Sequence, residues 1–509
     1  MTWRCCCFNV ATTVIMLSTK RESSSLCVPK LPLRYSTPGR IALSAVLSVS
    51  STPSTCTKVH QRLTLLQDVL TRLSGLGHPH SSNPCDKDIR RGISCHERFD
   101  MSNQTHSPLV LLQAEGITRG VPPHLPALQI LQRSTVGPTV RLCAVGDIGL
   151  SGRAAATANR WGSDTLFAEV APVLQAADIT FGNLESPLAN EIAPGKMFAA
   201  PTEGAAALYK AGFNLIHLAN NHVGEYGQLG LAATLDAVCK AGMMPLGAGE
   251  SLGVAQQLVR TDVNGLRIGW LGCGRTQLPQ NGVGPRYWEF DEQELLAAVI
   301  QARPEVDVLI VSMHIGFMFL DYPHPRHKAL AERLMRAGVN LVLMHHAHVL
   351  QGIQVIESGS VCCYNLGNFV WDYLEGNVLT ETMLDEQQEG AVFIFDLDAQ
   401  GIASIAVLPT WLDAECRVRW AVQGQGDKIL HRLQRISLGL NIDYQHEFDR
   451  QRRERNFGHN LRVLAFHARR GNWAVVFDNL RRTRFEHLRQ AMGYVLEPLL
   501  HTYSRRKSG

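Results

Sequence analysis

The 509-residue sequence has no uninterrupted apolar run of about 18 residues, which argues against an ordinary membrane-spanning helix. It contains no Cys-x-x-Cys pair, so neither a cysteine zinc site nor a thioredoxin-like redox motif is expected. The net charge is only +4, which excludes a strongly basic nucleic-acid-binding protein on bulk charge alone. Hydrophobic residues make up 45% and charged residues 18% of the chain, so a sizeable core can be buried.

Basic residues gather at both ends of the chain. Residues 1–100 hold 13 Lys and Arg against 6 Asp and Glu, and residues 451–509 hold 13 against 4, so the middle is acidic. The first stretch is rich in Ser and has little hydrophobic periodicity. Residues 5–17 resemble the core of a signal peptide but lack a clear cleavage site. We expect residues 1–136 to be a low-order region, or an over-extended translation start with Met101 as the true first residue.

The stretch 416–509 is predicted to form a basic helical extension. Apolar residues recur at helical spacing between 461 and 480, and arginines lie among them. A solvated helical face over the main domain explains this pattern. The alternative is a surface for a peripheral membrane, an assembly partner or an anionic polymer. No nucleic-acid-binding motif accompanies the arginines, so a specific nucleic-acid partner is not expected.

The remaining region, 137–415, reads as an alternating α/β domain. Strand-length apolar runs are found at 140–145, 178–181, 214–219, 266–271, 307–312, 340–344 and 391–397. Helical periodicity covers 164–176, 203–211, 228–240, 291–302 and 325–337, and 353–364 reads as a hairpin. This order predicts largely parallel, mixed β-sheets flanked by helices. Ligands of such folds bind beyond the carboxyl ends of the strands.

Polar residues follow five successive strands at those ends. Each has an ordinary explanation when it is taken alone, such as a turn, a surface charge or a hydrogen-bonded core histidine. Together they form a set of carboxylate, amide and imidazole groups that suits zinc, manganese or iron. The candidate metal ligands are Asp147, Glu185, Asn221, His314, His346 and His348.

One or two divalent ions held in this way would activate a water molecule and polarise a phosphoryl or acyl oxygen. A nearby histidine that binds no metal could protonate the leaving group. Arg153 and Arg275 follow strand ends and are candidates for contact with an anionic substrate, because guanidinium groups bind carboxylate and phosphate oxygens in pairs. A surface position explains either arginine equally simply. Asn368 is a further candidate for this contact, although shaping a turn is the simpler explanation.

The motifs at these positions resemble those of the capsule synthesis CapA family. They are GDIGLSGR (146–153), DITFGNLESPL (178–188), ANNH (219–222), VSMHIG (311–316), HHAHVLQ (345–351) and YNLGNFVWD (364–372). The resemblance covers about 270 residues, roughly 138–410, and implies a calcineurin-like metallophosphoesterase fold and a link to poly-γ-glutamate capsule production.

The same resemblance implies individual roles. Asp147 matches the first metal motif, and Glu185 matches the carboxylate expected to bridge two ions. Asn221 matches a metal ligand, and His222 matches the acid or phosphate-contacting group of the Asn-His pair. The remaining ligands would be His314, His346 and His348.

Two departures from the family pattern weaken the expectation. The histidine that usually follows this aspartate two positions later is missing after Asp147, so the number of bound ions, one or two, is left open. Met318 stands where the family commonly has a glutamate, so a substrate-facing carboxylate is missing.

The sequence therefore predicts one of two functions. The first is a metal-dependent hydrolase that acts on a phosphoester or an amide-linked anionic polymer. The alternative is a non-catalytic component of capsule or exopolymer assembly that binds the polymer. The sequence leaves open whether the protein is an enzyme. We expect a cytoplasmic protein, with export or membrane association as the alternative.

Overall fold

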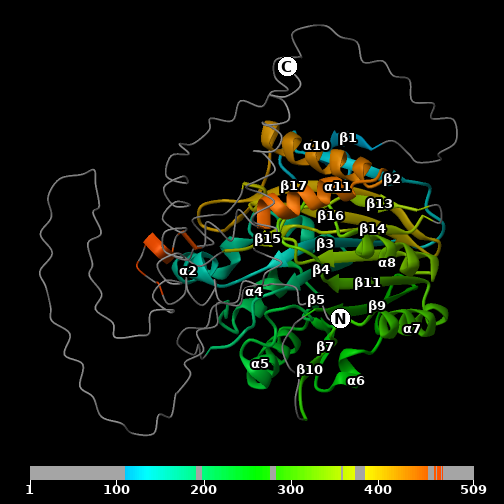
Figure 1. The fold of residues 1–509 in the computed structure, drawn as a ribbon. Coiled ribbons are helices and arrows are strands. Elements are labelled where there is room, and N and C mark those ends of the chain that lie inside the picture. The colour runs from blue at the N-terminus through cyan, green and yellow to red at the C-terminus, as the bar shows by residue number, and fades with distance from the viewer. Residues whose placement is uncertain are drawn as a thin grey trace, which may run out of the picture. The chain divides into compact units, whose positions relative to one another are not determined.

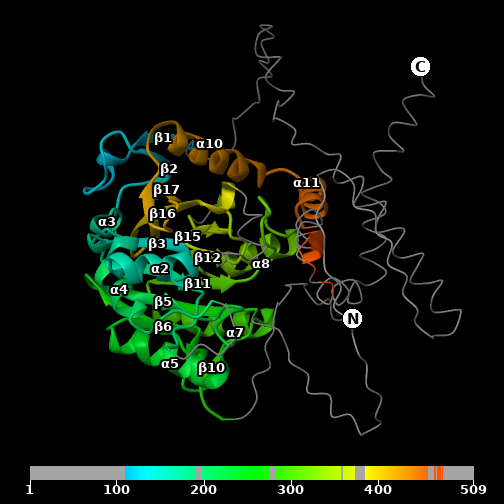
Figure 2. The ribbon, with the colours of Figure 1, turned by 90° about the vertical axis from the view of Figure 1, so that its left-hand side faces the viewer.

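Two β-sheets stacked face to face form the centre of the molecule, with helices on their outer sides (Figures 1 and 2). The computed structural model describes residues 109–190, 198–275, 283–356, 359–372 and 385–456, with isolated positions between 464 and 473. All of them lie within one compact unit, Asn103–Gly509. The predictions for the chain before residue 109 and for the arginines after residue 473 fall outside the described residues.

The first sheet has parallel strands at one side and antiparallel strands at the other. Neighbouring strands follow the order β1-β2-β17-β16-β3-β4-β5-β6, with β15 beside β3 and β18 beside β17. Their bounds are β1 Val110–Gln113, β2 Pro126–Gln132, β3 Val140–Ile148, β4 Ile179–Leu184, β5 Leu215–His217, β6 Met244–Leu246, β15 Asn368–Val370, β16 Glu389–Asp398, β17 Gly401–Leu412 and β18 Val418–Trp420. Strands β3 to β6 are mutually parallel, and β16 runs antiparallel to β3.

The second sheet repeats this plan with the order β13-β14-β12-β11-β9-β8. Its strands are β8 Val259–Val263, β9 Leu266–Gly274, β11 Val308–His314, β12 Leu341–His345, β13 Ile353–Val355 and β14 Val361–Cys363. Strands β9, β11, β12 and β14 are parallel, and the outer strands β8 and β13 are antiparallel. A separate small pair joins β7 Ala248–Gly249 to β10 Arg286–Tyr287.

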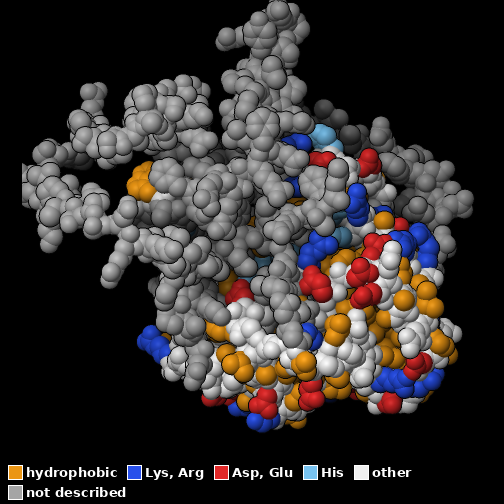
Figure 3. Space-filling model, turned by 60° about the horizontal axis from the view of Figure 1, so that its bottom comes forward, with side chains coloured by type: hydrophobic (Ala, Val, Ile, Leu, Met, Phe, Trp, Pro, Cys, Tyr) orange, Lys and Arg blue, Asp and Glu red, His pale blue; other side chains and the backbone are white. Residues whose placement is uncertain are grey.

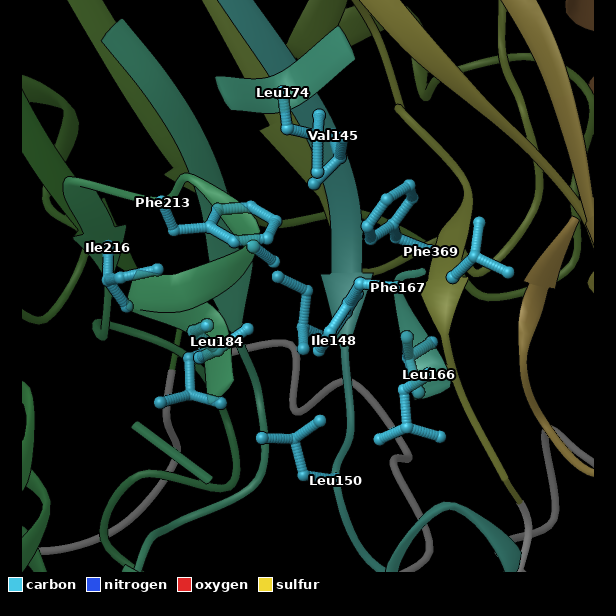
Figure 4. Close-up of a cluster of buried hydrophobic side chains, with 14 of the residues drawn as sticks. Val145, Ile148, Leu150, Leu166, Phe167, Leu174, Leu184, Phe213, Ile216 and Phe369 are labelled. Atoms are coloured by element: carbon cyan, nitrogen blue, oxygen red, sulfur yellow. The ribbon is translucent and has the colours of Figure 1, made fainter. Parts of the chain in front are cut away.

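Successive side chains of the inner strands are buried on opposite faces, as the two-residue period requires. In β3, Leu142 and Ala144 enter the layer between the sheets, while Cys143 and Val145 enter the outer layer under the helices. Figure 4 shows part of that outer layer, where Phe167 stacks on Phe369 with ring centroids 6.2 Å apart. Because both faces of both sheets are covered, the strands are almost continuously apolar.

The helices divide between the two outer faces, as Figure 1 shows on either side of the sheets. Helices α2 Gly152–Trp161, α3 Ala171–Gln175, α4 Gly204–Ala211 and α5 Gly227–Lys240 pack on the first sheet. Helices α7 Glu292–Ala302, α8 Pro325–Arg336 and α11 Gln445–Gln451 pack on the second, with α6 Leu252–Ala255 beside them. Helix α10 Gln423–Gly439 covers the end of the central layer, and a π-helical turn Arg452–Asn456 follows α11.

The expected fold class, mixed β-sheets flanked by helices, is confirmed. One predicted helix differs, because 164–176 forms a 3₁₀ turn, Ser163–Leu166, and the short α3. Pro172 lies at the start of α3, where its missing N–H does no harm, and it disfavours a helix that runs through it. In place of the low order expected for 1–136, residues 110–132 supply β1 and β2 at the edge of the first sheet.

A buried network of charges joins the C-terminal helices to the loop that follows β11. Asp321 is 4% exposed and accepts from Arg432 at 2.7 Å and from Arg455 at 3.1 Å. Burial raises the pKa of Asp321, but the two guanidinium groups outweigh it and hold the pKa below its ordinary value. Arg432 also reaches Glu389 of β16 at 3.1 Å. The segment 423–456 is therefore fixed to both sheets.

Within the described part of the chain, no helix has the length and hydropathy needed to cross a membrane. Figure 3 shows that apolar, acidic and basic side chains are closely mixed on the visible part of the described surface.

We predict that Gly146→Ala destabilises the fold by about 2–4 kcal/mol, because the new methyl group would meet the backbone of the adjacent strand. A Cβ at Gly146 would lie 2.0 Å from the carbonyl oxygen of Gly367. The control is Gly424→Ala near the start of α10, where nothing lies within 4 Å. Urea unfolding followed by circular dichroism measures both variants. Equal midpoints would show that the two strands tolerate the extra carbon.

Candidate metal centre

The parallel strands of both sheets end at the same edge of the molecule, and the predicted ligands meet there. From the first sheet, Asp147 lies near the end of β3, Glu185 directly follows β4, and Asn221 follows β5. From the second sheet, His314 ends β11, and His346 and His348 follow β12. The six residues come from five strand ends, as the sequence analysis expected.

Glu185 lies at the middle of the cluster. Its side chain is fully buried, and neither carboxylate oxygen has a hydrogen-bond partner among the described residues. A buried carboxylate without donors is costly, since nothing replaces the water it has lost. Burial, with the nearby charges of Asp147 and Glu225, raises the pKa of Glu185 well above its ordinary value. A bound cation would remove this cost.

A first group of ligand atoms combines Glu185 with His314 and His346. The Nε2 atom of His314 lies 3.4 Å from Glu185 Oε1, 3.1 Å from His346 Nδ1 and 2.6 Å from Asn221 Oδ1. Donor atoms that surround one zinc-sized ion at about 2.0–2.2 Å lie about 3–3.4 Å from one another. The spacing of these atoms therefore suits one ion.

A second group combines the same Glu185 with Asp147 and His348. His348 Nδ1 lies 3.4 Å from Asp147 Oδ2, and its Nε2 lies 3.8 Å from Glu185 Oε1. Glu185 thus belongs to both groups, which is the position of a bridging carboxylate. The His/Asp/Glu cluster suggests divalent metal binding, and the residues present fit such an ion.

Neighbouring polar side chains fix the orientation of these ligands. Asn183 donates from Nδ2 to Asp147 Oδ1 at 2.8 Å, and the same atom lies 3.2 Å from His314 Nδ1. Asn368 Oδ1 lies 2.9 Å from His348 Nδ1. His345 Nδ1 lies 3.4 Å from Asp147 Oδ1. Such supporting contacts set ring and carboxylate orientation in metal sites.

The imidazoles are held in the uncharged form that binds metals. Burial, with the neighbouring His348, lowers the pKa of His346 to about 3, and burial also lowers the pKa of His348. Burial and the surrounding histidines lower the pKa of His314 well below its ordinary value. At neutral pH all three offer a lone pair, which a metal ligand requires.

The backbone at two ligands is strained. His346 has φ 97° and His348 has φ 55°, in the left-handed region that residues with a Cβ rarely adopt. Such conformations cost about 1–3 kcal/mol each and persist where the surrounding structure over-determines them. Here the strain turns two imidazoles from one short turn toward the same pair of carboxylates.

His222 lies at the edge of the cluster. Its Nδ1 is 2.7 Å from Glu225 Oε1, and its Nε2 is 3.7 Å from Glu185 Oε1. The ring packs on Phe198, with centroids 4.4 Å apart, and the side chain stays 12% exposed. One ring nitrogen is therefore held by Glu225 while the other faces the cluster and solvent.

The two arginines differ in their surroundings. Arg153 binds Asp372, with Nε 2.9 Å from Oδ1, and donates to the carbonyl of Ala414, so its guanidinium contacts the protein itself. Arg275 is exposed, and its backbone N–H donates to the carbonyl of His314 at 3.0 Å. Substrate binding by either arginine stays a prediction.

Sequence reasoning missed several supporting residues. The sequence favours a turn at Asn368, but the side chain contacts His348. No local pattern predicts this contact, because β15 is positioned by β3, and Asn368 pairs with Asp147, 221 positions earlier in the chain. Asn183 and His345 lie inside the motifs of Glu185 and His346. Their closeness in sequence to these ligands is the signal that could have identified them.

Comparisons with known proteins find similarity to bacterial capsule synthesis proteins. Residues 141–373 match the model of the family described as bacterial capsule synthesis protein PGA_cap. The capsule biosynthesis protein CapA of Bacillus anthracis is 31% identical over 282 residues, covering 52% of this chain and 66% of the relative. The PGA biosynthesis protein CapA of Bacillus subtilis is 31% identical over 239 residues, covering 45% and 62%. The chain thus spans just under two thirds of these relatives' length.

Two solved structures are similar at a lower level. A phosphatase of Mycoplasma pneumoniae has 15% identity and a TM-score of 0.36, covering 54% of this chain and 94% of that one. A 5'-nucleotidase of Candida albicans has 11% identity and a TM-score of 0.33, covering 62% and 61%. Similarities of this size add nothing to the geometry described above.

We predict that the His346→Ala/His348→Ala double variant loses bound metal. The parent protein should hold about one to two equivalents of manganese, zinc or iron, because Glu185 is shared by two ligand groups. Elemental mass spectrometry after reconstitution measures this, and His431→Ala, an exposed histidine on α10, is the control. A double variant that keeps its metal would place the ion elsewhere.

We also predict opposite effects of Glu185→Gln with and without metal. Folding raises the pKa of this carboxyl, so the group destabilises the folded protein as pH rises above the pKa that it has in the unfolded chain. At pH 7 the free energy of unfolding of the metal-free variant should therefore be about 1–3 kcal/mol higher than that of the parent. With metal added, only the parent should gain stability. Thermal melts in EDTA and in Mn²⁺ provide the measurement, with exposed Glu250→Gln as the control. A metal-free variant no more stable than the parent contradicts this account.

Proposed function

We propose, for a chain that belongs to the family of bacterial capsule synthesis proteins, that its Glu185-centred cluster is a divalent-metal hydrolase site. Its substrate would be a phosphoester or an amide bond of an anionic polymer, in the synthesis of poly-γ-glutamate capsule. The relatives named for capsule or PGA biosynthesis motivate the pathway, and the side-chain geometry motivates the chemistry.

One observation carries this proposal: Glu185 is fully buried, lacks hydrogen-bond donors among the described residues and is shared by two ligand groups. A purely structural carboxylate would be paired with a cation or with several N–H groups. Asp321 in the same protein is paired in that way, with two arginines. Glu185 differs because it is oriented toward neutral imidazoles.

The first sheet would supply Asp147, Glu185 and Asn221 to the ion or ions, and the second sheet would supply the three histidines. When bound, the metal supplies a water-derived nucleophile and polarises the oxygen of the scissile group. The surrounding side chains keep this edge largely dry, since His348 packs against Trp371 with ring centroids 4.4 Å apart. Exclusion of water strengthens every electrostatic interaction in the site.

His222 would donate a proton from Nε2 to the leaving oxygen or nitrogen as the scissile bond breaks. Its Nδ1 is held by Glu225 at 2.7 Å, so Nε2 is the nitrogen directed toward the cluster. Partial solvent access of the ring would allow the proton to be replaced after each turnover.

A second function, polymer binding without catalysis, is favoured by the segment after His314. Met318 packs against the apolar layer under the first sheet, so this position offers no carboxylate to a substrate. The same cluster could then bind metal and hold a carboxylate chain as part of an assembly.

We predict that His222→Ala lowers kcat about 10²- to 10³-fold while metal content stays that of the parent, because the leaving group loses its acid. The assays use an alkyl phosphodiester and a γ-glutamyl oligomer, whose strongly basic leaving groups need a proton, with His431→Ala as the control.

The outcomes separate the two functions. A metal-loaded parent that cleaves neither probe but binds the oligomer, even after the His346→Ala/His348→Ala change, supports the binding component. An unchanged rate in His222→Ala would reject the assigned acid and leave the metal site standing.

A further inference from the structure

A second group of basic side chains lies beside the metal cluster, on elements of the second sheet's side. It consists of Arg275 just after β9, His324 and His327 at the start of α8, and Arg452 in the π-helical turn. We refer to these four residues as the basic rim.

The basic rim is built onto the segment that carries His314. The backbone N–H of Arg275 donates to the carbonyl of His314 at 3.0 Å. Phe317, three residues further on, stacks on His324 with centroids 5.6 Å apart, and the guanidinium carbon of Arg452 lies 5.1 Å from the centre of the same ring. The His324 and His327 rings are 5.6 Å apart. An aromatic ring thus has a guanidinium and an imidazole against it.

The loop under Phe317 also reaches the cluster directly. The N–H of Phe319 donates to the carbonyl of Ala347, between the ligands His346 and His348, at 2.7 Å. Arg455 donates to the carbonyl of Phe319 at 2.7 Å, which ties the π-helical turn to this loop. The loop that follows His314 therefore contacts both the basic rim and the turn that carries His346 and His348.

Among the described residues, the two arginines of the basic rim differ from the arginines around them in having no counter-ion. Arg432 and Arg455 are paired with Asp321, and Arg450 is paired with Glu447 and Glu454. Arg275 and Arg452 form no ion pair with any described residue. Asp449 is the carboxylate that acts on His324, and it accepts a hydrogen bond from Gln445. Within the described part of the chain, the two guanidinium groups of the basic rim thus lack a paired carboxylate.

His327 lies close to other members of the basic rim. Burial, with the nearby His324 and Arg275, lowers the pKa of His327 to about 3, and His327 in turn acts on His346. The basic rim therefore offers two guanidinium groups and neutral N–H donors on one side of the metal ligands.

We propose that the basic rim is an anion-binding subsite that holds a carboxylate of a polymeric ligand whose neighbouring bond lies at the metal cluster. The inference rests on the proposed function in taking the cluster as the place where that ligand is bound. Guanidinium groups bind carboxylate and phosphate oxygens alike, so the shared chemistry is an anionic oxygen, and a repeating carboxylate chain would fill both sites at once. The C-terminal segment 445–456 then belongs to the binding site.

The test measures the binding of a fluorescein-labelled γ-glutamate hexamer to the full-length protein by fluorescence anisotropy. Loss of two charge-assisted contacts in Arg275→Ala/Arg452→Ala should weaken binding at least about 10-fold. The control Arg450→Ala, from the same helical segment, should stay within about twofold, since its partners are exposed carboxylates. Equal affinities of the parent and the double variant would overturn the proposal.

Two further arms separate the remaining explanations. Inorganic phosphate and glutarate are compared as competitors of the hexamer. If phosphate displaces the hexamer at a lower concentration than glutarate does, and only in the parent, the subsite binds phosphate and the carboxylate assignment is overturned. Metal content of the double variant should equal that of the parent. Binding that depends on the basic rim in a protein without metal or turnover would reject the proposed hydrolase and leave the subsite standing. Turnover with unaltered hexamer affinity in the double variant would reject the subsite alone.

Discussion

The apolar layer between the two sheets decides whether the metal cluster can exist. The metal ligands come from both sheets, from β3, β4 and β5 in one and from β11 and β12 in the other. No backbone pairing joins these two sets of strands. The sheets are joined instead by side chains such as Phe181 of β4 and Trp270 of β9, which stack with centroids 5.6 Å apart. Phe181 also lies 5.8 Å from the ring of His345, directly under the cluster. Close packing here fixes the spacing of the sheets, because core packing tolerates little change in volume.

The electrostatic character of the molecule follows from this burial. The buried carboxylate of Asp321, away from the edge, is paired with Arg432 and Arg455. At the edge the pattern reverses, because Glu185 faces imidazoles whose protonation is disfavoured. Two nearby regions therefore have opposite needs, one for a cation and one, at Arg275 and Arg452, for an anion. A metal ion would meet the first need, and a ligand with one oxygen on that ion and a second negative group would meet the second.

Much of the parallel core and the cluster could be predicted from the sequence, because buried strands are short apolar runs and their polar ends are conspicuous. The run before Gly146–Asp147 and the run before His345–His346 are examples. The antiparallel additions were harder. Strand β2 depends on β17, and β17 on β16, so its few apolar residues indicate little until their partners are known. The contact of Asn368 with His348 and the position of Arg452 over Phe317 are likewise tertiary, and no local pattern announces them.

The antiparallel pairing of β3 with β16 has a consequence for the order in which the protein takes shape on the ribosome. Arg141 pairs with Asp396, 255 positions later, and Asn368 must arrive beside Asp147 before His348 is held. A strand at the heart of the first sheet therefore waits, with an unsatisfied edge, until most of the domain has been synthesised. Pairing at such separations is slow and leaves apolar edges open to wrong partners. The yield of folded protein would then depend on how long this edge stays exposed during synthesis.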